Sequence, residues 1–93
     1  MNKTLRQIIA EILSQDVLSS LELSSRLGIK EKEITYHLGH IRSSIKPKKL
    51  ILVEPAFCKD CGFKFKKRDR LNPPSRCPQC KGEYIERPRF SIP

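Results

Sequence analysis

Four cysteines are the residues whose type and spacing point most directly to chemistry. They form two Cys-x-x-Cys pairs with fifteen residues between them, at Cys58, Cys61, Cys77 and Cys80. This spacing is typical of zinc sites, because a tight turn in each pair brings two sulfurs to one cation and two pairs complete a tetrahedron. Gly62 after the first pair and Pro78 inside the second favour such turns. The sequence therefore predicts one zinc ion (Zn²⁺) per chain, bound by four thiolates.

A zinc ion with four thiolate ligands is expected to be structural. Its tetrahedron is full, so no position is open for a catalytic water. Zinc binding would contribute about 10 kcal/mol or more to the folding of a segment that has few apolar residues. Three alternatives would use the same cysteines: a redox-active pair, an iron centre of the rubredoxin type, or two disulfides. Zinc is favoured because a redox pair usually stands alone, rubredoxins are typically acidic with a longer spacer, and disulfides need an oxidising compartment.

The positive charge of the chain is concentrated around the cysteines. The formal net charge is +9. Residues 46–76 contain ten Lys or Arg and three Asp or Glu, whereas residues 1–45 contain six and five. Such a basic block is typical of proteins that bind nucleic acid, and a solvated surface that aids solubility has the same composition.

Helical signals fill the first half of the chain. Two capping boxes predict helix starts; they are formed by Thr4 with Gln7 and by Ser19 with Glu22. The first helix is expected to end at residues 14–16, and Gly28 suits the left-handed residue that ends the second. A third helix is expected from about residue 31 to residue 45, because Pro47 prevents its continuation. A short helix, a turn with glycine and a longer helix are typical of a helix-turn-helix, although an ordinary three-helix bundle has the same pattern.

After Pro47 the hydrophobic pattern becomes that of short strands. We expect residues 50–57 and 63–67 to pair as a hairpin that is both the wing of a winged helix and the turn of the first cysteine pair. Two more short strands are expected at 83–87 and 89–93. The predicted fold class is therefore α+β, with a three-helix winged-helix core followed by a small antiparallel zinc-ribbon sheet. The predicted domains are residues 1–49, the helix-turn-helix, and residues 50–93, the wing and zinc ribbon.

The third helix presents the residues that are expected to read DNA. Its apolar stripe, with Ile34, Leu38 and Ile41, faces the other helices, so a helical wheel places a polar set on the opposite side. The residues predicted for this groove face, with Thr35 at its flank, are Lys32, Thr35, Tyr36, Gly39, His40 and Ser43.

Other residues are expected to contact phosphates or to pack. The cations predicted to neutralise DNA phosphates are Arg42, Lys46, Lys48, Lys49, Lys64, Lys66, Lys67, Arg68, Arg70 and Arg76. His37 lies at the edge of the apolar stripe and is interpreted as a packing residue. Gly39 would allow either a close approach of DNA to the helix backbone or close packing against a neighbouring helix.

The chain also resembles known families. The run Ile34–Leu38, ITYHL, resembles the recognition helices of ArsR-type regulators, although the cysteine sensor sites of that family are missing from this helix. The block CKDCGFKFKKRDRLNPPSRCPQCKGEYIERPRFSI resembles small prokaryotic predicted transcriptional regulators that join a helix-turn-helix to a zinc ribbon. The resemblance implies a DNA-binding transcriptional regulator whose partner is double-stranded DNA.

Other classes of function are less well supported by the sequence. No acidic pair, nucleophile with a base, or phosphate-binding glycine loop indicates an enzyme. Two alternatives to DNA binding remain: a module that interacts with RNA polymerase, because general initiation factors also join a winged helix to a zinc ribbon, and an RNA-binding zinc ribbon. No signal peptide or membrane span is evident, so we expect a cytoplasmic protein. The oligomeric state stays open.

Overall fold

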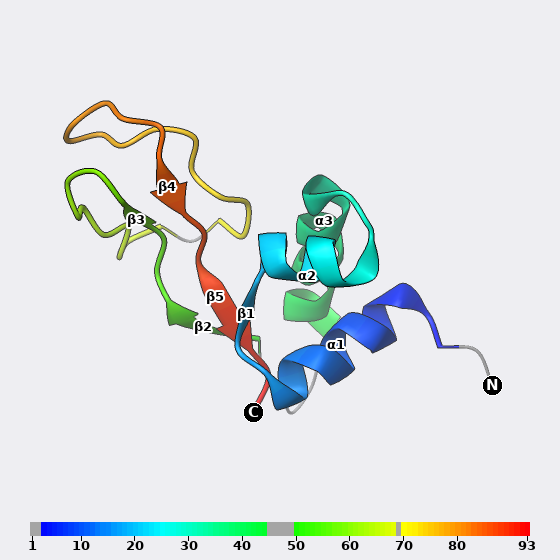
Figure 1. Cartoon of the computed structure of the whole chain (residues 1–93). Helices are drawn as coiled ribbons and strands as arrows, with labels where there is room; N and C mark the ends of the chain where they lie inside the picture. Colours follow the sequence, from blue (N-terminus) through cyan, green and yellow to red (C-terminus); the bar gives the residue numbers. More distant parts are fainter. Residues whose placement is uncertain (1–2, 45–49, 69) are drawn as a thin grey trace.

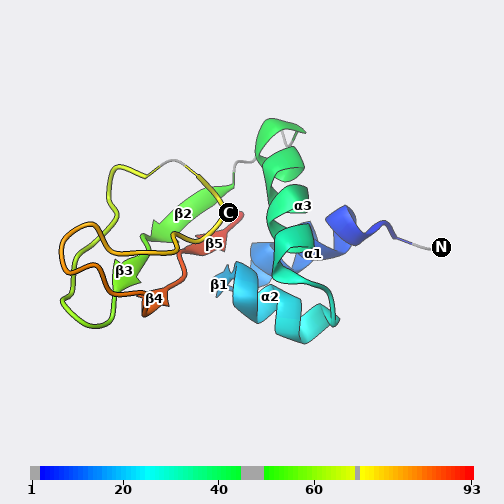
Figure 2. The same cartoon turned by 90° about the horizontal axis from the view of Figure 1, so that it is seen from above.

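The molecule is elongated, with its helices at one end and a small cysteine-containing ribbon at the other (Figure 1). The computed structural model describes residues 3–44, 50–68 and 70–93, and the Cα extents are 48 × 28 × 19 Å. The elements of these residues are α1 (Leu5–Gln15), β1 (Leu18–Ser19), α2 (Ser20–Leu27), α3 (Glu31–Ser44), β2 (Ile51–Glu54), β3 (Phe57–Cys58), β4 (Ile85–Glu86) and β5 (Arg89–Ser91). The short strands β1, β5 and β2 lie between the helices and the ribbon (Figure 2).

The first two helices begin and end where the sequence predicts. The Thr4 hydroxyl accepts a hydrogen bond from the N–H of Gln7 at 3.2 Å, and the Gln7 side chain accepts from the N–H of Thr4 at 2.8 Å. Ser19 and Glu22 repeat this capping box at 3.1 and 3.0 Å. Gly28 ends α2 in the left-handed conformation with φ +68°. The predicted end of the third helix, at residue 45 and Pro47, lies outside the described residues.

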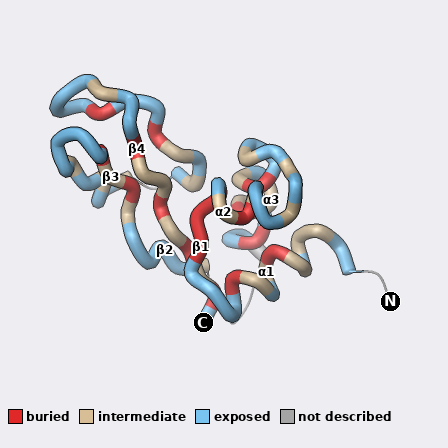
Figure 3. Tube along the Cα trace, in the orientation of Figure 1, coloured by how far each residue is buried: buried red, intermediate tan, exposed pale blue. Residues whose placement is uncertain are grey.

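One buried cluster joins the helices to the last strand of the chain. Its residues are Ile9, Leu13, Leu18, Leu23, Ile34, Leu38, Ile41, Phe90 and Ile92. Phe90 and Ile92 come from the C-terminus, and the N–H of Ile92 donates to the carbonyl of Leu13 at 2.8 Å. Figure 3 shows buried positions along β1 and on the inner sides of the helices, whereas the outer loops of the ribbon are largely exposed. The C-terminal residues therefore complete the helical core.

A smaller cluster lies in the ribbon, which we define as residues 55–88. It contains Ala56, Cys58, Cys77 and Ile85, with Phe63 and Phe65 packed against it. The strands β3 and β4 pair antiparallel here, with Phe57 opposite Glu86 and Cys58 opposite Ile85. A core this small has little apolar area to stabilise it, so the ribbon needs another source of folding free energy.

The expected hairpin of residues 50–57 with 63–67 forms only next to the first cysteine pair, and its wing half is wrong. The N–H of Cys58 donates to the carbonyl of Phe63 and the N–H of Phe65 to the carbonyl of Ala56, with Phe57 bridged to Lys64. The sheet order is β1-β5-β2, so β2 pairs with β5 instead. Pro55 divides the expected first strand into β2 and β3, because proline lacks the N–H that a continued ladder needs. The preference for β5 follows from burial: Phe90 and Ile92 enter the helical core, whereas Phe63 and Phe65 are used by the ribbon.

The ribbon is consequently inserted between two neighbouring strands. β2 leads into it and β5 leads out, and Leu52 and Glu54 of β2 lie opposite Phe90 and Arg89. The predicted α+β class, with helices followed by small antiparallel sheets, is confirmed. None of the helices in the described ranges has the length and apolar character needed to cross a membrane.

Candidate metal centre and candidate DNA-binding face

The four cysteine sulfurs converge at the tip of the ribbon. All four Sγ atoms lie within 4.8 Å of one another, with Cys58–Cys80 and Cys61–Cys77 separations of 3.6 Å. A tetrahedral ion with Zn–S bonds of about 2.3 Å places its sulfurs about 3.8 Å apart, so the cluster has the right dimensions. The same distances are much longer than an S–S bond of about 2.05 Å, and the four cysteines are free. The donor set and its spacing fit a zinc ion.

The first cysteine pair is held in a tight turn by its own backbone. The N–H of Cys58 donates to the carbonyl of Phe63 at 2.8 Å, and the N–H of Gly62 donates to the carbonyl of Cys58 at 2.8 Å. Gly62 has φ +83°, a conformation that glycine adopts without steric cost. This explains why glycine follows the second cysteine of the pair.

The second cysteine pair repeats the geometry of the first with one difference. The N–H of Cys77 donates to the carbonyl of Gly82 at 2.8 Å, and the N–H of Lys81 donates to the carbonyl of Cys77 at 3.0 Å. Lys81 therefore occupies the place of Gly62, and its φ is +66° although it has a side chain. A Cβ on Gly82 would lie 3.3 Å from Cys80 Sγ and 2.7 Å from Asp60 Oδ2. Glycine at position 82 thus lets the two turns approach each other.

Backbone N–H groups set the charge balance of the sulfurs. The N–H of Gly82 donates to Cys80 Sγ at 3.4 Å and the N–H of Cys80 to Cys77 Sγ at 3.5 Å. Burial alone would raise the pKa of Cys77. This effect is outweighed by hydrogen bonds from the N–H groups of Cys80 and Gln79 and by the neighbouring thiols, so the pKa of Cys77 is lowered to about 7.

The four thiols do not ionise together easily without a cation. The N–H of Phe63 favours the Cys61 thiolate, but burial and the other three cysteines outweigh it and raise the pKa of Cys61 to about 12. Neighbouring thiolates repel one another, and a divalent cation removes that repulsion and allows all four to be thiolates. The chemistry of the site is therefore that of a metal centre.

Comparisons with known proteins agree with this geometry. A model for PF0610-like proteins, N-terminal, matches residues 4–53, and a model for the PF0610 rubredoxin-like zinc beta-ribbon domain matches residues 55–93. The chain belongs to the PF0610-like family. The solution NMR structure of protein PF0610 from Pyrococcus furiosus is similar over 100% of this chain and 94% of that chain, with 34% identity and a TM-score of 0.78. No curated protein matches the chain.

The prediction of a structural zinc ribbon is confirmed for this PF0610-like chain. Cys58, Cys61, Cys77 and Cys80 are the ligands, and one Zn²⁺ per chain supplies the cross-link between the two turns. Four thiolates occupy the coordination shell, so the ion serves folding. It stabilises the ribbon at the place where the buried apolar cluster is small.

The outer face of α3 has the exposure that the helical wheel predicts. Ile34, Leu38 and Ile41 are buried against the other helices. On the opposite side Lys32, Tyr36, His40 and Ser43 are exposed, and Thr35 and Gly39 are half-buried. A Cβ on Gly39 would meet nothing within 4 Å in the described part of the chain, so the interpretation as a helix-packing glycine is wrong.

The predicted phosphate contacts fall in different places. Arg42 and Arg70 line a cleft of about 410 Å³ together with Lys32, Thr35 and Tyr36 of α3. A second hollow, on the ribbon, is lined by Lys64, Lys66, Lys67 and Arg68. Arg76 lies beside the second cysteine pair, where its Nε donates to the carbonyl of Lys81 at 3.3 Å. Lys46, Lys48 and Lys49 lie outside the described residues. The structure thus brings Arg70 of the ribbon to the α3 face, and another hollow is lined by both Arg68 and Arg42. The ribbon lysines Lys64, Lys66 and Lys67 do not line either of these two hollows.

Sequence reasoning missed two polar clusters around α3. Arg87 donates to both carboxylate oxygens of Glu31 at 3.1 and 3.2 Å, and Ser20 donates to Glu31 at 2.7 Å. This cluster ties the exit of the ribbon to the start of α3. The second cluster is near the N-terminus, where Arg6 Nε donates to His37 Nδ1 at 3.1 Å and the Arg6 guanidinium lies 5.8 Å from the Tyr36 ring centroid. The half-buried state of His37 agrees with its interpretation as a packing residue.

Proposed function

We propose that this chain is a sequence-specific DNA-binding transcriptional regulator with a winged helix whose wing carries the zinc ribbon. The proposed helix-turn-helix consists of α2, the turn at Gly28 and α3, and the two strands of the proposed wing are β2 and β5. The observation that carries the proposal is the outer face of α3. It combines an exposed polar surface with an inner side whose apolar residues are buried.

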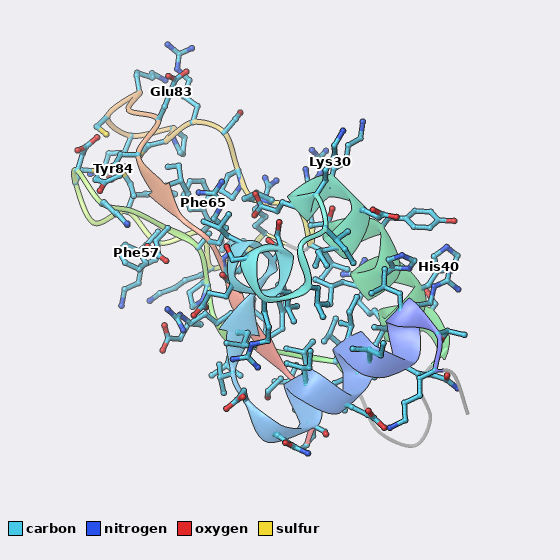
Figure 4. The ribbon with its side chains drawn as sticks, turned by 45° about the vertical axis from the view of Figure 1, so that its right-hand side comes forward. Lys30, His40, Phe57, Phe65, Glu83 and Tyr84 are labelled. Atoms are coloured by element: carbon cyan, nitrogen blue, oxygen red, sulfur yellow. The ribbon has the colours of Figure 1, made fainter. Side chains whose placement is uncertain are left out.

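The position of this face supports entry into a DNA groove. Figure 4 shows His40 projecting outward from α3, on the opposite side of the molecule from Tyr84 and the rest of the ribbon. Tyr36 has 60% of its surface exposed, and its ring lies 4.7 Å from that of His40. Both side chains can present hydrogen-bonding groups to base edges. Gly39 leaves the backbone between them open to close approach.

Cations beside the helix would supply phosphate contacts. Lys32 and Arg70 are exposed and line the same cleft next to α3. Arg70 belongs to the ribbon, so the inserted domain would add a backbone contact of the kind that gives affinity without sequence information. In this proposal α3 contacts the base edges and reads the sequence, and Arg70 neutralises a phosphate.

The test is selection from random duplexes at a fixed salt concentration, followed by titration of the enriched site. Tyr36→Ala is expected to lower affinity for that site by about 1–3 kcal/mol and to leave non-specific binding nearly unchanged. Tyr84→Ala is a matched control, because Tyr84 is 61% exposed but lies on the ribbon. Arg70→Ala is expected to weaken all duplexes alike and to reduce the salt slope by about 1. Equal losses for Tyr36→Ala and Tyr84→Ala would contradict the assignment of α3.

A second candidate is a protein-binding module of the transcription machinery, with RNA polymerase as partner. The observation in its favour is the same exposed Tyr36, because aromatic side chains are enriched at protein interfaces and the centre of this face has few cations. Selection that enriches no sequence, together with loss of polymerase binding in Tyr36→Ala, would support this candidate over the DNA-binding regulator.

A further inference from the structure

The ribbon has a hollow of about 410 Å³ that the proposed DNA face does not use. We call it the ribbon hollow; its described lining residues are Phe63, Lys64, Phe65, Lys66, Lys67, Arg68 and Pro78. The cleft beside α3 has none of these residues in its lining. In Figure 4 the ribbon residue Phe65 lies well away from His40, which projects from α3 on the other side of the molecule. The two surfaces can therefore bind different partners.

The lining combines apolar and cationic side chains. Phe63 and Phe65 are half-buried, with their rings edge to face at a centroid distance of 5.1 Å, and Pro78 adds a third apolar group. Lys64, Lys66 and Lys67 are exposed. The described lining contains no acidic residue. The volume is within the range of about 300–1,000 Å³ that is usual for ligand pockets, which is enough for one or two large side chains.

We propose that the ribbon hollow binds an acidic peptide segment of a partner protein, through one large apolar side chain flanked by carboxylates. The apolar side chain would contact Phe63, Phe65 and Pro78, where burial of apolar area is favourable. The flanking carboxylates would face Lys64, Lys66 and Lys67, and complementary charge speeds association and selects the partner. The hollow thus gives the chain a second interaction surface on the ribbon, independent of the reading of DNA.

The aromatic geometry favours a peptide over single-stranded nucleic acid. Proteins that bind single strands offer exposed aromatic faces on which successive bases stack. Here the two rings stand at an interplanar angle of 87° to each other and pack against the cluster that contains Cys58 and Cys77. They form an apolar wall, and no pair of parallel ring faces is available for stacking.

The test uses the full zinc-loaded chain and a fluorescein-labelled peptide of Asp and Glu residues with a central Phe and Leu. Fluorescence anisotropy at fixed salt measures its affinity. A control peptide with Ser in place of Phe and Leu has the same charge and is expected to bind about tenfold more weakly. The double change Lys66→Glu and Lys67→Glu is expected to weaken the first peptide by about tenfold or more, because it reverses two of the facing charges.

Matched controls separate this surface from general electrostatic attraction. Lys30→Glu reverses one charge at the exposed start of α3, half the change of the double variant, and it is expected to leave peptide affinity unchanged apart from the small effect of net charge. Backbone amide spectra and zinc content show that each variant is folded. Shifts of the Phe63 and Phe65 ring signals on titration are expected in the unaltered chain.

Three results would overturn the proposal. The first is equal affinity for the two peptides, and the second is a loss from Lys30→Glu at least half as large, on a logarithmic scale, as the loss from the double variant. The third is tighter binding of oligothymidine than of the peptide, which would make the hollow a nucleic-acid site. Tyr36→Ala, which tests the DNA-binding proposal, does not touch this hollow, so failure of one proposal is distinguishable from failure of the other.

Discussion

Phe90→Ala tests whether the C-terminal strand is a structural part of the helical domain. Phe90 is 2% exposed and lies in one cluster with residues of all three helices, although the whole ribbon separates it from them in sequence. Truncation of a fully buried Phe loses its transfer free energy and leaves a cavity, which together cost about 3–5 kcal/mol. Natural domains are stable by only about 5–15 kcal/mol, so the loss would be a large fraction of the total.

Urea denaturation of the zinc-loaded protein, followed by far-ultraviolet circular dichroism, measures this effect on the helices. With a slope of about 2 kcal/mol per M, a loss of about 4 kcal/mol would lower the midpoint by about 2 M. Phe57→Ala is the control, because Phe57 is half-buried and belongs to neither buried cluster, and it is expected to cost about 1 kcal/mol. A midpoint for Phe90→Ala no lower than that for Phe57→Ala would refute the argument that β5 completes the core.

Three further predictions concern the ribbon and α3. Cys77→Ser is expected to abolish the one-to-one zinc content in elemental analysis and to remove the amide-exchange protection of the ribbon. Helices α1 and α2 are expected to keep their amide protection, because the caps and core of these helices contain no zinc ligand. Lys81→Gly is expected to raise the free energy of unfolding by about 0.5–1 kcal/mol, measured by thermal unfolding with zinc, because it relieves a positive φ. Gly39→Ala is expected to stabilise α3 by about 1 kcal/mol, because alanine is the better helix former. It is also expected to weaken binding to the selected duplex, because the new methyl group would project into open space on the groove face. Unchanged duplex affinity would show that close approach of DNA to the backbone is not required.

Features encoded by neighbouring residues were predictable from the sequence. The capping boxes and Gly28 each depend on residues within one turn of the chain, so their patterns specify the helix ends directly. The cysteines were predictable for a similar reason, because each Cys-x-x-Cys turn is local and the requirement for four ligands joins the two turns. The assignment of the buried and exposed sides of α3 follows from the helical spacing of its apolar residues.

The pairing of β2 was not predictable in this way. Its alternatives, residues 63–67 and residues 89–91, are both short and both alternate apolar with polar side chains. Sequence proximity favours the first, and the choice of the second depends on where Phe90 and Ile92 are buried, which is known only once the helices have packed. The bond between Arg87 and Glu31 was missed for the same reason, since it joins residues far apart in sequence.

The insertion of the ribbon links the zinc site to α3 through a few defined contacts. The chain enters and leaves the ribbon on adjacent strands, and Arg89 at the exit lies 3.1 Å from a carboxylate oxygen of Glu22 in α2. Arg87 holds Glu31 at the start of α3, and Leu71 of the ribbon packs against the helical core next to Arg70. The loop with Leu71 and Arg70 joins the two cysteine turns that the zinc holds, and its Leu71 also packs against the helical core. We therefore expect zinc to influence the proposed DNA face only indirectly, by limiting where Arg70 lies beside α3, because the helices themselves are held by their own apolar core.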